Sequence, residues 1–165
     1  MSKKGYLTAE EYVAIRKTLG FTQEQLAEFH GVQNVRTIKR WERGDSFVSD
    51  IACDKIMNLF AQINAVVETA IEKWEDNPVP VVLIIYPDEC YKKFVVGIGD
   101  LPNSIHRAMV ERIYCNLMSR DAEVDIVKFN PQLYLMWLAD KGLTDSQDVR
   151  SMWAAEYIEK LKIAN

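Results

Sequence analysis

Hydrophobic positions recur with helical spacing through the first 45 residues and define three short segments. In the first segment, Tyr12, Ile15 and Leu19 lie three and four residues apart, which places them on one face of a helix. The second and third segments show comparable spacing, at Leu26, Ala27 and His30 and at Val35, Ile38 and Trp41. The pattern therefore predicts three short amphipathic helices in succession.

Polar residues and glycines mark the ends of these helices. A threonine precedes the first two segments, each with a Glu or Gln three residues later, in the pairs Thr8–Glu11 and Thr22–Gln25. This spacing is typical of a capping box, in which the two side chains satisfy backbone N–H groups at the start of a helix. Glycines that can end a helix in the left-handed conformation follow the three segments, at Gly20, Gly31 and Gly44.

The outer face of the third segment is polar and positively charged. Its cations are Arg36, Lys39, Arg40 and Arg43, and its neutral hydrogen-bonding side chains are Gln33, Asn34 and Thr37. Long cations reach phosphates, whereas amide and guanidinium groups form paired hydrogen bonds with base edges in the major groove. A solvated surface face is the alternative, and it is the better interpretation of an isolated charged helix. Here the helix follows another helix and a tight turn, and that context favours groove binding.

No glycine or proline interrupts the chain from Phe47 to Asn77. Apolar residues recur there at alternating steps of four and three, at Ile56, Phe60, Ile63, Val67, Ala70 and Trp74. This is the spacing of a heptad repeat, and it predicts one helix of about 26 residues that begins at Ser49 or Asp50 and spans ~40 Å. The alternative is a kinked or broken pair of helices.

The composition changes at Asp76–Pro80, because every proline of the chain lies at or beyond Pro78. Val81–Tyr86 is apolar and β-branched, which predicts a strand buried on both faces. Alternating residues from Val124 to Phe129 predict a second strand. Helices are expected near 103–120, 131–139 and 146–162, with apolar sides that include Leu133, Leu135, Met136 and Leu138 in the second of these and Met152 and Trp153 in the third.

Several of these residues together resemble a known DNA-binding motif. The run Arg16–Gln23, the pairs Leu26–Ala27 and Gly31–Val32, and the segment Trp41–Gly44 are similar to the Cro/CI-type (XRE-like) helix-turn-helix of phage and bacterial repressors. The chain departs from that pattern by one additional residue between Gly31 and Trp41, and by His30 at a position usually occupied by a buried aliphatic residue.

The resemblance implies roles for individual residues. It implies that Gln23 contacts a phosphate, that Arg16 pairs with Glu42, and that Trp41 is structural. It also assigns base reading to the first residues of the third helix, Gln33, Asn34, Arg36 and Thr37. The whole outline further resembles anti-CRISPR-associated repressors, phage-associated regulators that act as dimers on their own operon, although the chain beyond about residue 130 lies outside that resemblance.

These observations predict a mainly α fold with two domains. Residues 1–76 form a Cro/CI-like helix-turn-helix bundle with a long connecting helix, and residues 77–165 form a small C-terminal α/β unit with two short strands that serves dimerisation or interaction. The charge is distributed unevenly between them. Residues 1–50 carry a net charge of +1 and the remainder −5, whereas the segment 33–43 alone carries +3. A local basic footprint determines binding, and the acidic remainder predicts modest, salt-dependent affinity.

Catalytic and metal-binding chemistry has little support in the sequence. The histidines are His30 and His106, and the widely separated Cys53, Cys90 and Cys115 match no metal-ligand or redox spacing. We therefore expect no enzyme activity, no metal and no cofactor. The first five residues contain no apolar stretch typical of a signal peptide, and the longest apolar run is too short to span a bilayer. The chain is therefore expected to be cytoplasmic and without a membrane partner.

The sequence thus predicts a sequence-specific DNA-binding transcriptional regulator, a repressor, that acts as a homodimer on palindromic double-stranded DNA. RNA binding by the same basic face stays open. The alternative is a protein-interaction or ligand-sensing module, antitoxin-like, on a helix-turn-helix scaffold. A large apolar pocket between helices 103–120 and 131–162 would favour that alternative.

Overall fold

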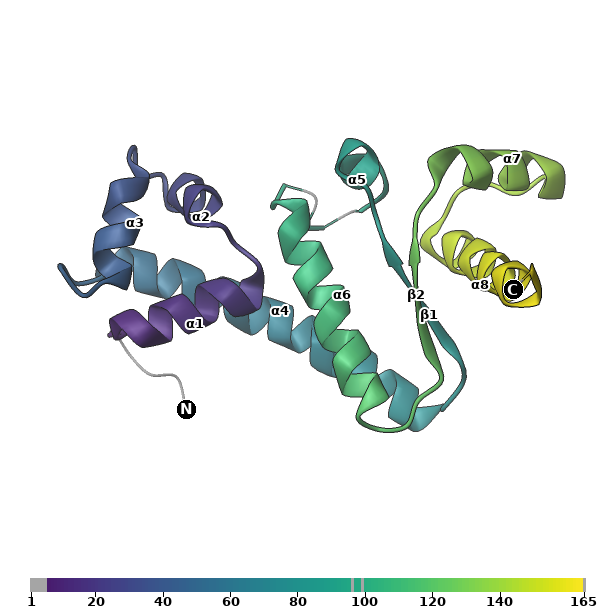
Figure 1. Ribbon diagram of the computed structural model, residues 1–165, viewed down its shortest axis with the longest axis horizontal. Coiled ribbons are helices and arrows are strands. Elements are labelled where there is room, and N and C mark those ends of the chain that lie inside the picture. Colours follow the sequence, from purple (N-terminus) through teal and green to yellow (C-terminus); the bar gives the residue numbers. More distant parts are fainter. Residues whose placement is uncertain (1–5, 96, 99, 165) are drawn as a thin grey trace. The chain divides into compact units, whose positions relative to one another are not determined.

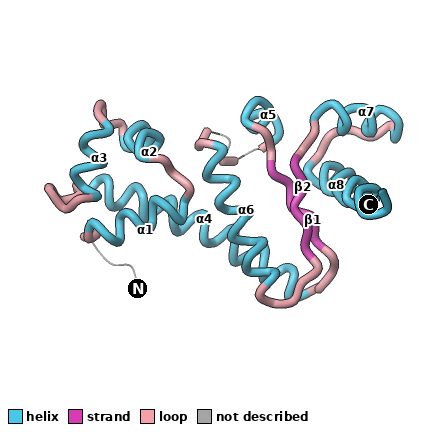
Figure 2. The backbone as a smooth tube through the Cα atoms, viewed as in Figure 1, coloured by secondary structure: helices cyan, strands magenta, loops and turns pink. Residues whose placement is uncertain are grey.

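The computed structural model describes residues 6–95, 97–98 and 100–164. Within them the chain is mainly helical, with eight helices and a sheet of two strands (Figures 1 and 2). It divides into two compact units, Met1–Thr69 and Ala70–Asn165. The division falls inside the long helix, whereas the sequence predicts a boundary at the proline-containing segment after it. The amino-terminal residues used to predict localisation lie outside the described part.

Three short helices form most of the first unit: α1 (Ala9–Leu19), α2 (Gln23–His30) and α3 (Val35–Glu42). Both predicted capping boxes are confirmed, because the Thr8 and Thr22 hydroxyls accept from the N–H groups of Glu11 and Gln25, whose side chains accept in return. Gly20 and Gly31 end α1 and α2 in the left-handed conformation, as predicted. Local chemistry therefore determines where these two helices begin and end.

The third helix ends through Gly44, as predicted, and the Asp45 N–H donates to the Arg40 carbonyl at 2.9 Å across the turn. Its last residue is Glu42, and Arg43 is the capping residue in a right-handed conformation. Gly44 follows at φ 74° within the turn, where it donates to the carbonyl of Trp41 at 3.1 Å. At the other end, the Asn34 side chain accepts from the N–H of Arg36 at 2.8 Å and so begins the helix.

The core of the first unit contains Tyr12, Leu26, Ile38 and Ile56, each 0% exposed. Trp41 packs edge-on against Tyr12, with ring centroids 5.9 Å apart. Contacts join α3 to both α1 and α2, so the buried side of α3 rests on the two preceding helices. Phe21, in the connection between α1 and α2, is also buried.

The long helix α4 (Asp50–Asp76) is continuous over 27 residues, as predicted, and Ser49 caps it through its hydroxyl and carbonyl oxygens. The predicted heptad stripe is confirmed at three of its six positions, Ile56, Ile63 and Val67, which are buried. Phe60, Ala70 and Trp74 are only half-buried. The full set of buried positions in α4 is Ala52, Cys53, Ile56, Leu59, Ile63, Val67 and Ile71. From Leu59 onward the steps between them are four residues, whereas a left-handed coiled coil alternates steps of three and four.

The second unit surrounds a parallel sheet of two strands. Its elements are β1 (Val81–Ile85), α5 (Asp88–Phe94), α6 (Asn103–Met118), β2 (Val124–Lys128), α7 (Pro131–Lys141) and α8 (Gln147–Ala164). The strands pair in register from Val81 opposite Val124 to Ile85 opposite Lys128. Helices α6 and α8 contact both strands, and Figure 1 shows the sheet between them.

Two expectations for the second unit require correction. Every residue of β1 is half-buried rather than fully buried, although α6 and α8 both contact the strand. In α7 the buried residue is Tyr134, whereas Leu133, Leu135 and Met136 are exposed. Met152 of α8 is exposed as well, although Trp153 beside it is buried.

An aromatic core fills the space beside the sheet. Phe129 lies 4.8 Å from Phe94 and 5.1 Å from Tyr134 between ring centroids. A buried Arg150 stacks over the Phe94 ring at 5.6 Å and donates to both oxygens of Asp145 at 2.8 and 2.7 Å. The Tyr134 hydroxyl donates to the same carboxylate, so the charge of Arg150 is neutralised where it is buried.

The position of His30 makes the stability of the first unit dependent on pH. Its ring stacks against Tyr12 at 6.1 Å, and neither ring nitrogen has a hydrogen-bond partner among the described residues. Burial, assisted by the charge of Lys55, lowers its pKa to about 4. In the unfolded chain His30 keeps its ordinary pKa near 6.5, so it takes up a proton at a higher pH than it does in the folded protein. The stability due to neutral His30 is therefore complete above about pH 6.5 and is lost as the pH falls through 4.

We expect wild type to lose up to about 3 kcal/mol of unfolding free energy through His30 between these pH values. The His30→Leu variant removes the titrating group and should lose less over the same range. Urea unfolding of both proteins at pH 7 and pH 4.5 measures the difference. His106 is unchanged in the variant and its pKa is also lowered to about 4 by burial, so it serves as an internal constant. Identical pH dependence in the two proteins would contradict the assignment.

Candidate functional site

The outer face of α3 presents three cations to solvent. Arg36, Lys39 and Arg40 are exposed, and none of them forms a salt bridge with another residue in the described part of the chain. Gln33 and Asn34 are exposed just before them, and Thr37 is half-buried. The structure therefore brings the cationic side chains predicted from the sequence onto one accessible helical face, opposite Ile38 and Trp41.

A hydrogen-bond network joins the end of α3 to the two preceding helices. The Glu42 carboxylate, whose side chain is only 9% exposed, accepts from Nε of Arg16 on α1 and from the amide nitrogen of Gln23 on α2. Arg16 also donates to the carbonyl of Phe21 at 2.8 Å. The ion pair that the family resemblance implies between Arg16 and Glu42 is thus present. One buried carboxylate connects the end of α3 to both preceding helices.

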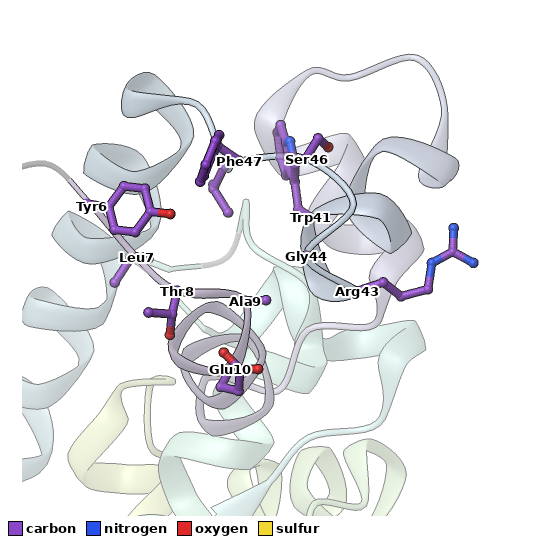
Figure 3. A pocket seen from close by; sticks show the side chains of 11 residues that line it. Tyr6, Leu7, Thr8, Ala9, Glu10, Trp41, Arg43, Gly44, Ser46 and Phe47 are labelled. Atoms are coloured by element: carbon purple, nitrogen blue, oxygen red, sulfur yellow. The ribbon is translucent and has the colours of Figure 1, made fainter.

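Three of the candidate side chains are already engaged in other interactions. Gln23 is half-buried and donates to Glu42 at 2.5 Å, an interaction that the sequence did not predict. The side-chain oxygen of Asn34 is used to cap α3, which leaves its amide nitrogen available. Arg43 pairs with Asp45 at 3.0 Å on the surface, and its guanidinium points away from the neighbouring pocket (Figure 3).

The pocket in Figure 3 lies where α3 ends, next to the start of α1. It has a volume of about 230 Å³, and its walls include Leu7, Trp41, Gly44 and Val48. Two exposed rings, Tyr6 and Phe47, lie 5.6 Å apart at this site. Pockets that bind small molecules usually measure about 300–1,000 Å³, so this one falls below that range.

A second pocket bears on the ligand-sensing alternative. It has a volume of about 250 Å³ and lies between α7 and α8, where Leu133, Trp137, Trp153 and Tyr157 give it an apolar lining. This location is not the one that the sequence interpretation specified, between helices 103–120 and 131–162. Its volume also falls below the usual range for a ligand site.

One contact at the end of α2 was not predicted from the sequence. Lys55 of α4 donates to the carbonyl of Phe29 and lies 4.6 Å from the centre of its ring. The ammonium group therefore compensates an unpaired carbonyl in the last turn of α2. No sequence signal reveals this contact, because the two residues are 26 positions apart and belong to different helices.

His106 and two of the cysteines are buried in the described part of the chain. His106 is buried beside Tyr86 and Tyr91, with ring centroids 5.6 and 5.7 Å away. Burial raises the pKa of the Cys53 and Cys90 thiols, which disfavours their reactive thiolate forms. Within the described ranges, no cluster of three or more His, Cys, Asp or Glu residues could hold a metal ion. No helix in those ranges is both long and apolar enough to cross a bilayer.

Comparison with models of known protein families found no match, and a search of curated protein sequences found no significant similarity.

Removing the Glu42 carboxylate should destabilise the first unit. In Glu42→Ala, the guanidinium of Arg16 stays largely buried without its counter-charge, so we expect a loss of about 3 kcal/mol. Asp45→Ala is the matched control, because it removes a carboxylate from an exposed pair with Arg43 and should cost under about 1 kcal/mol. Urea unfolding followed by tryptophan fluorescence measures both. Equal losses would show that the buried network has no special role.

Proposed function

We propose that the chain is a DNA-binding transcriptional regulator whose first unit is a Cro/CI-like helix-turn-helix. The observation that carries this proposal is the exposed, unpaired cationic face of α3, fixed from below by Ile38, Trp41 and Glu42. A helix held rigidly on its apolar side presents its outer side chains in a constant geometry. Such a helix fits the major groove, where orientation determines which base edges are reached.

The chemistry of the exposed face suits both parts of DNA recognition. Arg36, Lys39 and Arg40 are long cations without competing carboxylates among the described residues, so they are available to phosphates and to guanine edges. Gln33 and the amide nitrogen of Asn34 add neutral donors at the start of the helix. Gln23 supports the end of α3 by donating to Glu42. We propose that it also contacts a phosphate.

Specific recognition also requires two copies of this unit. A single helix-turn-helix covers only a few base pairs and buries too little surface for strong specificity. Two copies related by a two-fold axis would occupy successive major grooves ~34 Å apart and recognise a palindrome. We therefore propose a homodimer that acts as a repressor by occupying its operator.

The proposal is tested with a site selected from random duplex DNA, which reports sequence, symmetry and half-site spacing together. On that site, Arg36→Ala and Arg40→Ala should each weaken binding by about 1–3 kcal/mol without change in the fold. Fluorescence anisotropy at several salt concentrations measures affinity, and each lost phosphate contact should reduce the salt slope by about one.

Lys17→Ala is the matched control. Lys17 is an exposed cation on α1 of the same unit, and its loss changes the net charge equally. We expect its affinity to stay near that of wild type. If all three variants bind as wild type does, or if all three lose affinity equally, α3 does not read the groove. If a parallel selection enriches a structured RNA and no duplex DNA is enriched, the ligand of this face is RNA and not DNA.

A further inference from the structure

The small sheet has two edges, and the edge formed by β1 is open. The Val81 N–H donates to the Glu123 carbonyl at 2.9 Å, and the Ile85 carbonyl accepts from the Phe129 N–H at 2.8 Å. Because backbone groups alternate along a strand, Val82 and Ile84 direct theirs away from β2. No other described residue forms a hydrogen bond with the backbone groups of these two residues.

The two strands differ in how their edges are protected. β2 contains Asp125 and Lys128, and Lys162 of α8 lies 2.9 Å from the Asp125 carboxylate. Charged residues of this kind are a common means of preventing further strands from adding to a sheet. β1 has none, since it reads Val-Val-Leu-Ile-Ile and all five side chains are half-buried. A five-residue apolar strand with an open edge is the kind of surface that accepts another strand.

The residues flanking β1 match what an antiparallel copy of the same strand would need. With a two-fold axis at Leu83, Val82 lies opposite Ile84 of the second copy. The N–H group of each of these two residues then donates to the carbonyl of the other. In the same register, Pro80 faces Tyr86. Proline has no N–H to offer, and the Tyr86 carbonyl does not need one, because it already accepts from Asn103 at 2.8 Å. The Tyr86 N–H remains to pair with the Pro80 carbonyl.

We propose that two copies of this chain associate through β1, paired antiparallel about Leu83 to form a continuous sheet of four strands. A second copy is the occupant that fits best, because every residue it brings opposite β1 is apolar and no like charges meet in this register. Isologous pairing also satisfies the closed symmetry typical of soluble dimers. It converts a sheet of two strands, which is marginal by itself, into one of ordinary size.

This inference builds on the proposed function, because it supplies the two-fold axis that palindrome binding requires. Its tests use no DNA, so the two proposals can fail separately. A dimer held by β1 that binds no duplex would leave this inference intact. Specific DNA binding by a protein whose dimer does not depend on β1 would overturn this inference alone.

The first test places a cysteine on the proposed axis. Leu83 faces its own copy as a non-hydrogen-bonded pair, with Cα atoms about 4.5 Å apart, which is within the range that a disulfide can bridge. Leu83→Cys, made in a Cys115→Ser background because Cys115 is exposed, should give a disulfide-linked dimer under mild oxidation. Ile85→Cys is the matched control: it changes the same strand and the same sheet face, but its two copies would lie about 14 Å apart.

The second test removes an outward donor. Val82→Pro eliminates the N–H that faces away from β2, so pairing within the chain is retained while pairing between chains is blocked. Ile126→Pro makes the same change on the outer side of β2. We expect wild type and Ile126→Pro to be dimers by sedimentation equilibrium, and Val82→Pro to be a monomer with an unchanged circular dichroism spectrum.

Each other outcome overturns the inference. These outcomes are a monomeric wild type, a dimeric and folded Val82→Pro, and a disulfide-linked dimer of Ile85→Cys with none of Leu83→Cys. If Val82→Pro does not fold, the two cysteine variants decide alone. Association of β1 with a strand of a different protein would appear as a monomeric wild type that gives no symmetric cross-link.

Discussion

The geometry of the first unit depends on one nearly buried carboxylate. Glu42 stands at the last residue of α3 and accepts from Arg16 of α1 and Gln23 of α2. A buried carboxylate and guanidinium are expensive to remove from water, so their stability relies on both partners and on good geometry. Here the cost is offset by hydrogen bonds that converge from two helices. The three helices consequently cannot shift independently, and the outer face of α3 keeps a constant orientation relative to the core.

Burial and exposure are divided along α3 with unusual clarity. Ile38 and Trp41 pack against Tyr12 and its neighbours, whereas the cations turn outward into water. The same division explains why His30 is tolerated beside the rings of Tyr12 and Trp41. A neutral imidazole stacks on aromatic rings as a flat apolar body, and it does so as long as its pKa remains far below neutrality.

The sequence was most informative where the chemistry is local. The capping boxes at Thr8 and Thr22 and the glycines after α1 and α2 depend on residues within one turn, so their spacing alone predicted them. The cationic face of α3 followed from helical periodicity for the same reason. Contacts between distant residues were not predictable in this way. Gln23 with Glu42 and Lys55 with Phe29 are joined only by the tertiary fold.

Periodicity also failed where apolar residues surround a helix. In α7 apolar residues occupy every side of the helix, so their spacing does not indicate which side is buried. Only the structure shows that Tyr134 is buried while Met136 is exposed. In α4 the heptad spacing predicted Ile56, Ile63 and Val67 correctly as buried residues. Leu59 and Ile71 are buried where Phe60, Ala70 and Trp74 were predicted to be, and these three are half-buried.

The contrast between the two edges of the sheet has a consequence for how far assembly can proceed. Strand addition is hazardous because each new strand exposes a fresh edge, which can recruit the next chain without limit. In this chain β2 contains Asp125 and Lys128, and Lys162 lies 2.9 Å from the Asp125 carboxylate. Growth through β1 would therefore stop after a single step, which would give a finite, closed particle instead of a fibre.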